Sequence, residues 1–224
     1  MCKSIKSMRE EEMMQDLQRD ALARAVVEAL DGPQRNTALC RQLVRLLAEG
    51  QPVSPLHLAE ALHRAPDEVM TELRAHPELE YDAHGNIIGS GLTLVPTVYQ
   101  VQMNGHRLFA WCALGALTNP IQLKLSARVL SRCEVAGRTI RFTATPHRLV
   151  DLDPPDAVMS LVLTSASACC YDLRGTFCHH SQFFSSQDVA VTWQATHPDA
   201  LVLDLQEAYQ VAQLVVAYQA ANGA

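Results

Sequence analysis

The sequence predicts an α+β fold, with helices in the first part of the chain and antiparallel strands mixed with helices in the second. Two observations predict it. Up to about residue 76, apolar residues recur at the spacing of amphipathic helices, which are separated by Gly and Pro stops. From about residue 79 onward, several short segments alternate apolar and polar residues, which is typical of half-buried strands.

Four helices are expected in the first part, and most begin or end at residue types that favour helix termini. In the second of them, four leucines fall at i, i+4, i+7 and i+8, so they share one helix face. The third begins at Ser54 and Pro55, which suit an N-cap and a first helical residue. The expected helices cover residues 16–30, 36–49, 54–64 and 66–76.

Two strands around a polar turn, at residues 79–81 and 87–94, follow the helices. Three helices and then a hairpin is the order of a winged helix, a module that often binds DNA through its third helix. The charge of this region argues against that use, because residues 55–95 carry two arginines against seven carboxylates. A surface that must neutralise phosphates needs the opposite balance, so we expect a structural role for this lobe.

The second half predicts mostly strands. Residues 97–103 and 106–110 form a hairpin around Asn104-Gly105, the strongest short hairpin signal. Residues 111–117 then suggest a short helix closed by Asn119-Pro120. Further strands are expected at residues 127–132, 138–144, 157–163 and 201–205, a loop with short helices at 169–193, and a final amphipathic helix at 206–221. We expect the lobes to divide near Pro96, giving domains 1–96 and 97–224.

Composition and cysteine content limit the cellular compartments and the classes of binding partner that we expect for this protein. The 224 residues are 48% hydrophobic and 19% charged, with a net charge of −6, which is an ordinary globular composition. Apolar runs are too short for a membrane-spanning helix, and no secretory signal is visible in the first 15 residues. Seven cysteines without a framework spacing predict free thiols. We therefore expect a cytoplasmic protein that binds neither a membrane nor nucleic acid.

Cysteines are the best candidates for chemistry, because no CxxC, GxSxG, P-loop, HExxH or Rossmann glycine pattern is present. Cys112 lies where a strand gives way to a helix, a position that stabilises a thiolate, although a free cysteine is more often a small buried apolar residue. Cys178 precedes His179 and His180, which suits a metal site or an activated nucleophile, or else a core cysteine beside two surface histidines. The remaining cysteines are an adjacent pair that suits soft-metal ligation or a buried turn (Cys169 and Cys170), a core candidate (Cys133) and two without a partner in sequence (Cys2 and Cys40).

Three motifs, in the same order along the chain, carry a resemblance to a known family. Residues 82–94 read DAHGNIIGSGLTL, residues 107–114 read RLFAWCAL, and residues 177–184 read FCHHSQFF. Together they resemble the organomercurial (alkylmercury) lyases, over a stretch from about Arg41 to about Leu214. The first 15 to 20 residues look like an extension to this family.

The resemblance implies a winged-helix-like N-terminal lobe packed on a C-terminal lobe of antiparallel strands and helices. It also implies a reaction, the protonolysis of R–Hg⁺ to R–H and Hg²⁺, with Cys112 and Cys178 as the two thiols that bind mercury. Cys133 matches a structural cysteine of the family. The implied partners are an organomercurial substrate, Hg²⁺ as product and a mercuric reductase that accepts it, and no cofactor is implied.

One position departs from the family pattern. The family has an aspartate three residues after the first thiol, and this chain has Gly115, which cannot carry a proton. We expect the proton to come from the second thiol, from a water in the space left by the carboxylate, or from His179 or Asp172. Two other functions remain open: a binder of mercury or another soft metal that does not cleave its ligand, and a metal-responsive regulator.

Overall fold

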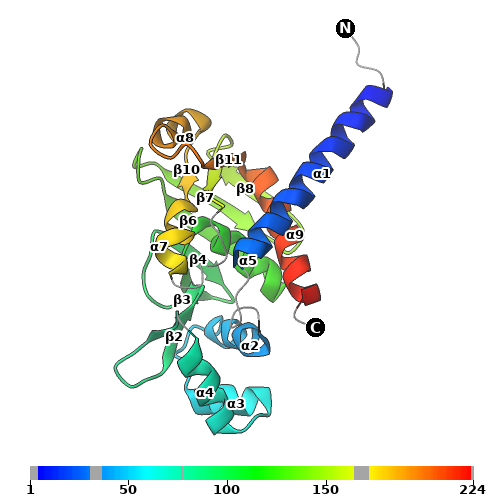
Figure 1. Ribbon diagram of the computed structural model, residues 1–224. Coiled ribbons are helices and arrows are strands. Elements are labelled where there is room, and N and C mark those ends of the chain that lie inside the picture. Colours follow the sequence, from blue (N-terminus) through cyan, green and yellow to red (C-terminus); the bar gives the residue numbers. More distant parts are fainter. Residues whose placement is uncertain (1–4, 31–36, 77, 164–171, 223–224) are drawn as a thin grey trace.

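The computed structural model describes residues 5–30, 37–76, 78–163 and 172–222. Within these residues the strands form one eight-stranded antiparallel sheet and one three-stranded sheet, with helices at one end and along the side (Figure 1). The helices are α1 (Ile5–Leu30), α2 (Ala38–Leu47), α3 (Pro55–Leu62), α4 (Pro66–Ala75), α5 (Ala113–Leu123), α7 (Leu173–Thr176), the 3₁₀ turn η1 (Cys178–His180), α8 (Gln187–Gln194) and α9 (Leu205–Asn222). The α+β class is confirmed.

The N-terminal helices follow the expected order. Ser54 caps α3 by accepting a hydrogen bond from the backbone N–H of His57 at 3.1 Å, and Thr37 caps α2 in the same way. The leucines predicted to share one face of α2 are buried (Leu39, Leu43, Leu46 and Leu47). The first helix begins at Ile5 rather than Asp16, because residues rich in Met, Glu and Arg favour a helix without needing an apolar face.

The large sheet has the strand order β1-β2-β3-β5-β4-β6-β7-β8. Its strands are β1 (Glu80–Tyr81), β2 (Ile87–Ser90), β3 (Leu92–Thr93), β4 (Tyr99–Met103), β5 (His106–Ala110), β6 (Ala127–Arg132), β7 (Thr139–Ala144) and β8 (Leu149–Asp153). The predicted hairpin is confirmed, since β4 pairs with β5 and both Asn104 and Gly105 have positive φ. The single strand expected at residues 87–94 is wrong: the chain reverses at Gly91, whose φ of 76° favours glycine.

This reversal connects the two halves of the chain. After Gly91, β3 pairs with β5, so Leu92 lies opposite Ala110 in the same sheet. Strands from both sides of residue 96 therefore belong to one hydrogen-bonded sheet, and the division of the chain at that residue stays a prediction. Through this pairing the end of β5 lies next to β3, which in turn contacts α2.

Helix α5 continues to Leu123 with Pro120 inside it. The sequence-based prediction that it ends at Asn119-Pro120 is therefore wrong. An internal proline costs a helix one backbone hydrogen bond. Here α5 packs on α9 and on the strands beneath it, and it buries residues along its whole length, which outweighs that cost. The helix ends one turn later, at Lys124 in a left-handed conformation.

The small sheet has the order β10-β9-β11 and comprises β9 (Val158–Leu161), β10 (Phe183–Phe184) and β11 (Leu201–Asp204). All four residues of β9 are buried, and β11 leads directly into α9, which lies against α1 and α5. The predicted strands at 157–163 and 201–205 and the final helix are confirmed within one to two residues. Sequence reasoning missed β8 and β10, because β8 buries only one residue and β10 has two.

Replacing Gly91 tests the reversal between β2 and β3. We expect Gly91→Ala to lower the free energy of unfolding by about 1–2 kcal/mol, because an L-residue is strained at this φ although its Cβ meets no neighbour within 4 Å. Gly115→Ala is the matched control: it lies in helix α5 and should raise stability by about 0.5 kcal/mol. Urea denaturation followed by circular dichroism measures both, and an unchanged Gly91→Ala midpoint would contradict this account.

Candidate active site

Cys112 lies at the junction between β5 and α5. Just before it, the backbone N–H of Trp111 donates to the carbonyl of Gly91 at 3.1 Å, which ties this junction to the β2–β3 reversal. Cys112 is the N-cap residue of α5, and its Sγ accepts a hydrogen bond from the backbone N–H of Gly115 at 3.5 Å. A sulfur in this position takes the place of a capping oxygen, and the unpaired amides of the first helical turn stabilise its thiolate.

Cys178 begins the 3₁₀ turn η1, and Ser181 after it fixes the turn against α5. The Ser181 carbonyl accepts from the backbone N–H of Ala113 at 3.0 Å and from the Tyr99 hydroxyl at 3.2 Å. Its own hydroxyl accepts from the backbone N–H of Leu114 at 3.0 Å. Ser181 is fully buried and uses two of the N–H groups at the start of α5. Sequence reasoning missed this residue, because a serine within FCHHSQFF has no pattern that marks it.

The other end of the turn is held by the small sheet. Ser160 on β9 donates its hydroxyl to the carbonyl of His180 at 2.7 Å and accepts from the backbone N–H of Gln182 at 3.2 Å. Both Ser160 and Ser181 are buried and have hydrogen-bond partners, as buried hydroxyls require. The turn that carries Cys178 is therefore fixed to the small sheet on one side and to α5 on the other.

The two thiols share one hydrogen bond. The Cys178 thiol donates to Cys112, which lowers the pKa of Cys112, and the N–H groups of the first turn of α5 lower it further against the opposing effect of burial. The same hydrogen bond raises the pKa of Cys178, and burial raises it more. Both side chains are buried, at 5% and 7% exposure. The shared hydrogen bond therefore favours the thiolate form at Cys112 and the protonated form at Cys178.

A cavity of about 140 Å³ opens on both thiols. Apolar side chains from α1, α5, α7 and α9 form most of its wall, including Leu30, Leu114, Leu173 and Val215. Gly115 lies on the same wall, and a Cβ added there would be 3.8 Å from the Sγ of Cys112 and 3.6 Å from the Cβ of Ala110, which is ordinary van der Waals contact. The backbone therefore leaves room for a Cβ at this position.

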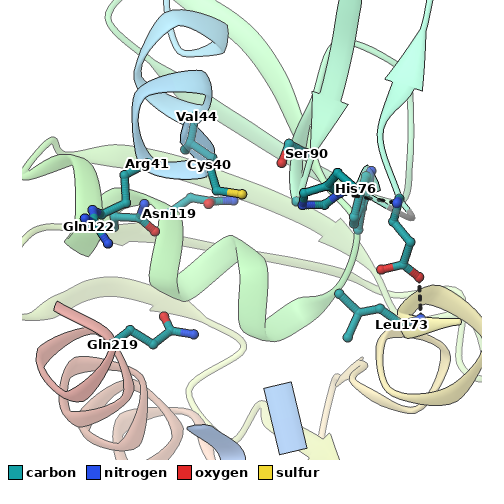
Figure 2. A pocket seen from close by; sticks show the side chains of 12 residues that line it. Cys40, Arg41, Val44, His76, Ser90, Asn119, Gln122, Leu173 and Gln219 are labelled. Atoms are coloured by element: carbon teal, nitrogen blue, oxygen red, sulfur yellow. Dashed lines mark hydrogen bonds between the residues drawn. The ribbon is translucent and has the colours of Figure 1, made fainter. Parts of the chain in front are cut away.

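A second cavity of about 170 Å³ adjoins the first (Figure 2). The two share part of their walls (Gly91, Trp111, Asn119, Leu173 and Gln219). The outer cavity is more polar and is lined by Cys40 and Arg41 of α2 and by His76 and Glu78 after α4. The Glu78 carboxylate accepts a hydrogen bond from the backbone N–H of Leu173, which joins α7 to the N-terminal part.

The structure brings the predicted pair Cys112 and Cys178 together, with Gly115 beside them. Cys133 is fully buried in the turn after β6, where its Sγ accepts from the backbone N–H of Ala136 at 3.5 Å, as a structural cysteine would. Cys40, to which the sequence assigns no role, lines the outer cavity. Three further cysteines (Cys2, Cys169 and Cys170) lie outside the described residues.

Two of the expected proton donors lie away from the thiols. His179 is exposed and its ring packs against that of His180, while Asp172 is exposed and caps α7 by accepting from the backbone N–H of Gly175 at 2.8 Å. Neither lines the cavity that opens on the thiols. In the described part of the chain, no group of three or more His, Cys, Asp or Glu side chains is arranged to hold a metal ion.

Comparison with known proteins decides the family. The model of the alkylmercury lyase family matches residues 92–217, and the model of the helix-turn-helix domain of alkylmercury lyase matches residues 19–91. The chain belongs to the alkylmercury lyase family. The first match covers both thiols, and the second covers the lobe with winged-helix order.

Three curated alkylmercury lyases show how far the family likeness extends. The protein of Streptomyces lividans is 38% identical over 88% of this chain and 91% of its own length. That of Pseudomonas putida is 38% identical over 82% and 85%, and that of Staphylococcus epidermidis 36% over 77% and 79%. Among solved structures, the mercury-bound form of MerB2 shares the fold, with a TM-score of 0.72 and 22% identity over 90% of this chain and 97% of that one.

The sequence predicts no membrane-spanning helix. Across the helices that the structure describes, none combines the length and the apolar character that crossing a bilayer requires. The longest apolar-faced helices, α1 and α9, pack against each other instead.

The hydrogen bond between the thiols can be tested by titration. We expect Cys178→Ala to raise the pKa of Cys112, because the largest effect that lowers this pKa is lost while burial still opposes the charge. Since only the thiolate reacts, the pH at which iodoacetamide alkylates Cys112 should move upward, as measured by peptide mass spectrometry. Cys133→Ala, which removes a thiol outside the cavity, should leave this pH profile in place. Equal profiles for wild type and Cys178→Ala would contradict the assignment.

Proposed function

We propose that this family member cleaves the carbon–mercury bond of organomercurials, giving R–H and Hg²⁺. The observation that carries the proposal is a buried pair of thiols joined by a hydrogen bond beside a largely apolar cavity. Mercury is a soft metal and prefers thiolates over oxygen and nitrogen ligands. The apolar wall suits the organic group of such a substrate, and the family membership supports the reaction class.

The Cys112 thiolate begins the reaction. Its lone pair forms a bond to the mercury of R–Hg⁺, giving Cys112–S–Hg–R. No base is needed at this step, because the thiol contact and the helix N-terminus already stabilise the thiolate. An ordinary thiol of pKa about 8.5 is only a few per cent ionised at neutral pH.

Cys178 completes the reaction. Its sulfur bonds to mercury and its proton passes to the carbon, so the electron pair of the Hg–C bond becomes the C–H bond. The products are R–H and Cys112–S–Hg–S–Cys178, and atoms and charge balance without another acid. The raised pKa of Cys178 supports this role, because the group stays protonated until mercury replaces its proton. Of the donors expected from the sequence, the second thiol is therefore the one we propose, with a water beside Gly115 as its alternative.

Release of Hg²⁺ requires exchange onto other thiols, because both sulfurs are buried. We propose that the outer cavity admits the accepting thiol, from a small molecule or from a mercuric reductase. Its polar wall, with Cys40 and Arg41, distinguishes it from the apolar inner cavity.

A second function, binding without cleavage, is favoured by one observation. Gly115 has no side chain, and the described residues that line the inner cavity include no Asp, Glu or His. General acids typically contribute about 10²- to 10⁴-fold to a rate, so a site without one holds an organomercurial longer before cleaving it. The same two thiols would then sequester a soft metal.

Release of benzene from phenylmercury decides between these functions. We expect wild type to release benzene catalytically and both Cys112→Ala and Cys178→Ala to fall to the background rate, because each removes one Hg–S bond and one removes the proton. Gas chromatography measures the product, and Cys133→Ala is the control that keeps its rate. Tight retention of phenylmercury without any benzene would favour the binding function instead.

Restoring a carboxyl group tests the role of Gly115. We expect Gly115→Asp to increase the rate of benzene release by about 100-fold, because its Cβ meets only van der Waals contacts and burial beside the thiols favours a protonated carboxyl group. Gly115→Asn is the matched control, with the same shape but no acidic proton, and should give no gain. Equal rates for the two variants would show that the step is not limited by an acid at this position.

A further inference from the structure

Two buried hydrogen-bond donors in the cavity wall have no acceptor. The side-chain nitrogen of Asn119 and the indole nitrogen of Trp111 are fully shielded by protein, and no hydrogen-bond acceptor reaches either among the residues that the structure describes. Asn119 is only 6% exposed. Both residues line the inner cavity with the thiols and the outer cavity as well. The proposed reaction uses neither of them.

The positions of Asn119 and Trp111 in the chain relate them to Cys112 and Gly115. Asn119 follows Gly115 by four residues, so it lies on the same helix face one turn further on, about 6 Å along the axis. Trp111 directly precedes Cys112 at the end of β5. Both residues therefore flank the segment that carries Cys112 and Gly115, and they lie in the wall that the two cavities share. Figure 2 shows Asn119 on this wall, across from the residues of α2.

Buried donors without a partner are unusual, because native proteins pair nearly all such groups. An occupant that brings no acceptor leaves them unpaired, whereas one with a correctly placed oxygen satisfies them. Sites built to hydrogen-bond a substrate reject analogues that lack the acceptor far more strongly than apolar sites reject a change of shape. Apart from the two thiols, Thr118 and Gln219, the rest of the inner wall is apolar, so donors without a partner stand out as an element that can discriminate.

We propose that Asn119 and Trp111 form a donor pair whose side chains turn toward the cavity to bind an oxygen atom in the organic group of the substrate, since protein covers both nitrogens in this structure. This inference rests on the proposed function and names its substrate class: organomercurials with an ether, hydroxyl or carbonyl oxygen a few bonds from mercury. Asn119 and Trp111 are specificity-determining residues, and they take no part in moving the proton. Hydrocarbon organomercurials enter the same cavity but leave the pair unsatisfied.

Two organomercurials of matched shape test the proposal. 2-Methoxyethylmercury and n-butylmercury differ by one oxygen in place of one CH₂ group, so they fill the cavity alike. The measured quantity is the ratio of their kcat/KM values in one protein preparation, from which the fraction of folded enzyme cancels. We expect wild type to prefer the methoxyethyl compound by about tenfold or more.

Variants assign the preference to the donor pair. Asn119→Leu replaces the amide by an apolar group of similar size and should reduce the ratio to one or below. Trp111→Phe removes the indole N–H alone and should reduce it in part. Thr118→Val is the matched control: Thr118 lines the same cavity, but its hydroxyl already donates to the Leu114 carbonyl at 3.1 Å, so the ratio should stay at the wild-type value.

The same pair of compounds separates failure of this inference from failure of the proposed function. If neither compound is cleaved, the proposed function fails. The donor pair is then tested by partition of each compound between the protein and glutathione, in which the same preference of about tenfold is expected. A ratio near one in wild type, or a preference that persists in Asn119→Leu, overturns the inference and shows that the donors serve a bound water or the fold.

Discussion

The site depends on one contact, the hydrogen bond from the Cys178 thiol to Cys112. It makes two chemically equal groups differ, because it lowers the pKa of Cys112 and raises that of Cys178, although burial raises the pKa of both. The N-terminus of α5 adds to this effect, because the Gly115 N–H also points at the Cys112 sulfur. One group can then bind mercury while the other retains the proton that the proposed reaction needs.

The rest of the fold keeps this contact in place. Ser181 joins the 3₁₀ turn to α5 through both its carbonyl and its hydroxyl, and Ser160 joins the same turn to the small sheet. On the other side, the reversal at Gly91 brings β3 beside β5 and fixes the strand end from which α5 begins. Packing of α5 against α9 is strong enough to retain Pro120 inside the helix. The large sheet, the small sheet and the helices therefore meet at the two thiols.

One face of α5 carries the two positions on which the proposals depend. Gly115 has no side chain beside Cys112, and Asn119, one turn further, has a buried amide nitrogen without a partner. Burying an unpaired donor costs stability, which is why such groups are rare in native proteins. On the proposed function this helix face offers no carboxylic acid for catalysis, and on the proposed donor pair it recognises an oxygen-bearing organic group.

Much of this protein follows from its sequence alone. Periodicity and turn residues predicted most helices and strands, and motif resemblance identified the family and singled out the two thiols that the structure brings together, because these signals are local in the chain. The contact between the thiols is not local: Leu114 and Ser181, which join their segments, are 67 residues apart. Packing decided the extension of α5 past Pro120, the reversal at Gly91 and the exclusion of His179 and Asp172 from the cavity. Only the tertiary structure shows which polar groups remain unpaired, because hydrogen-bond satisfaction depends on neighbours that the sequence does not place.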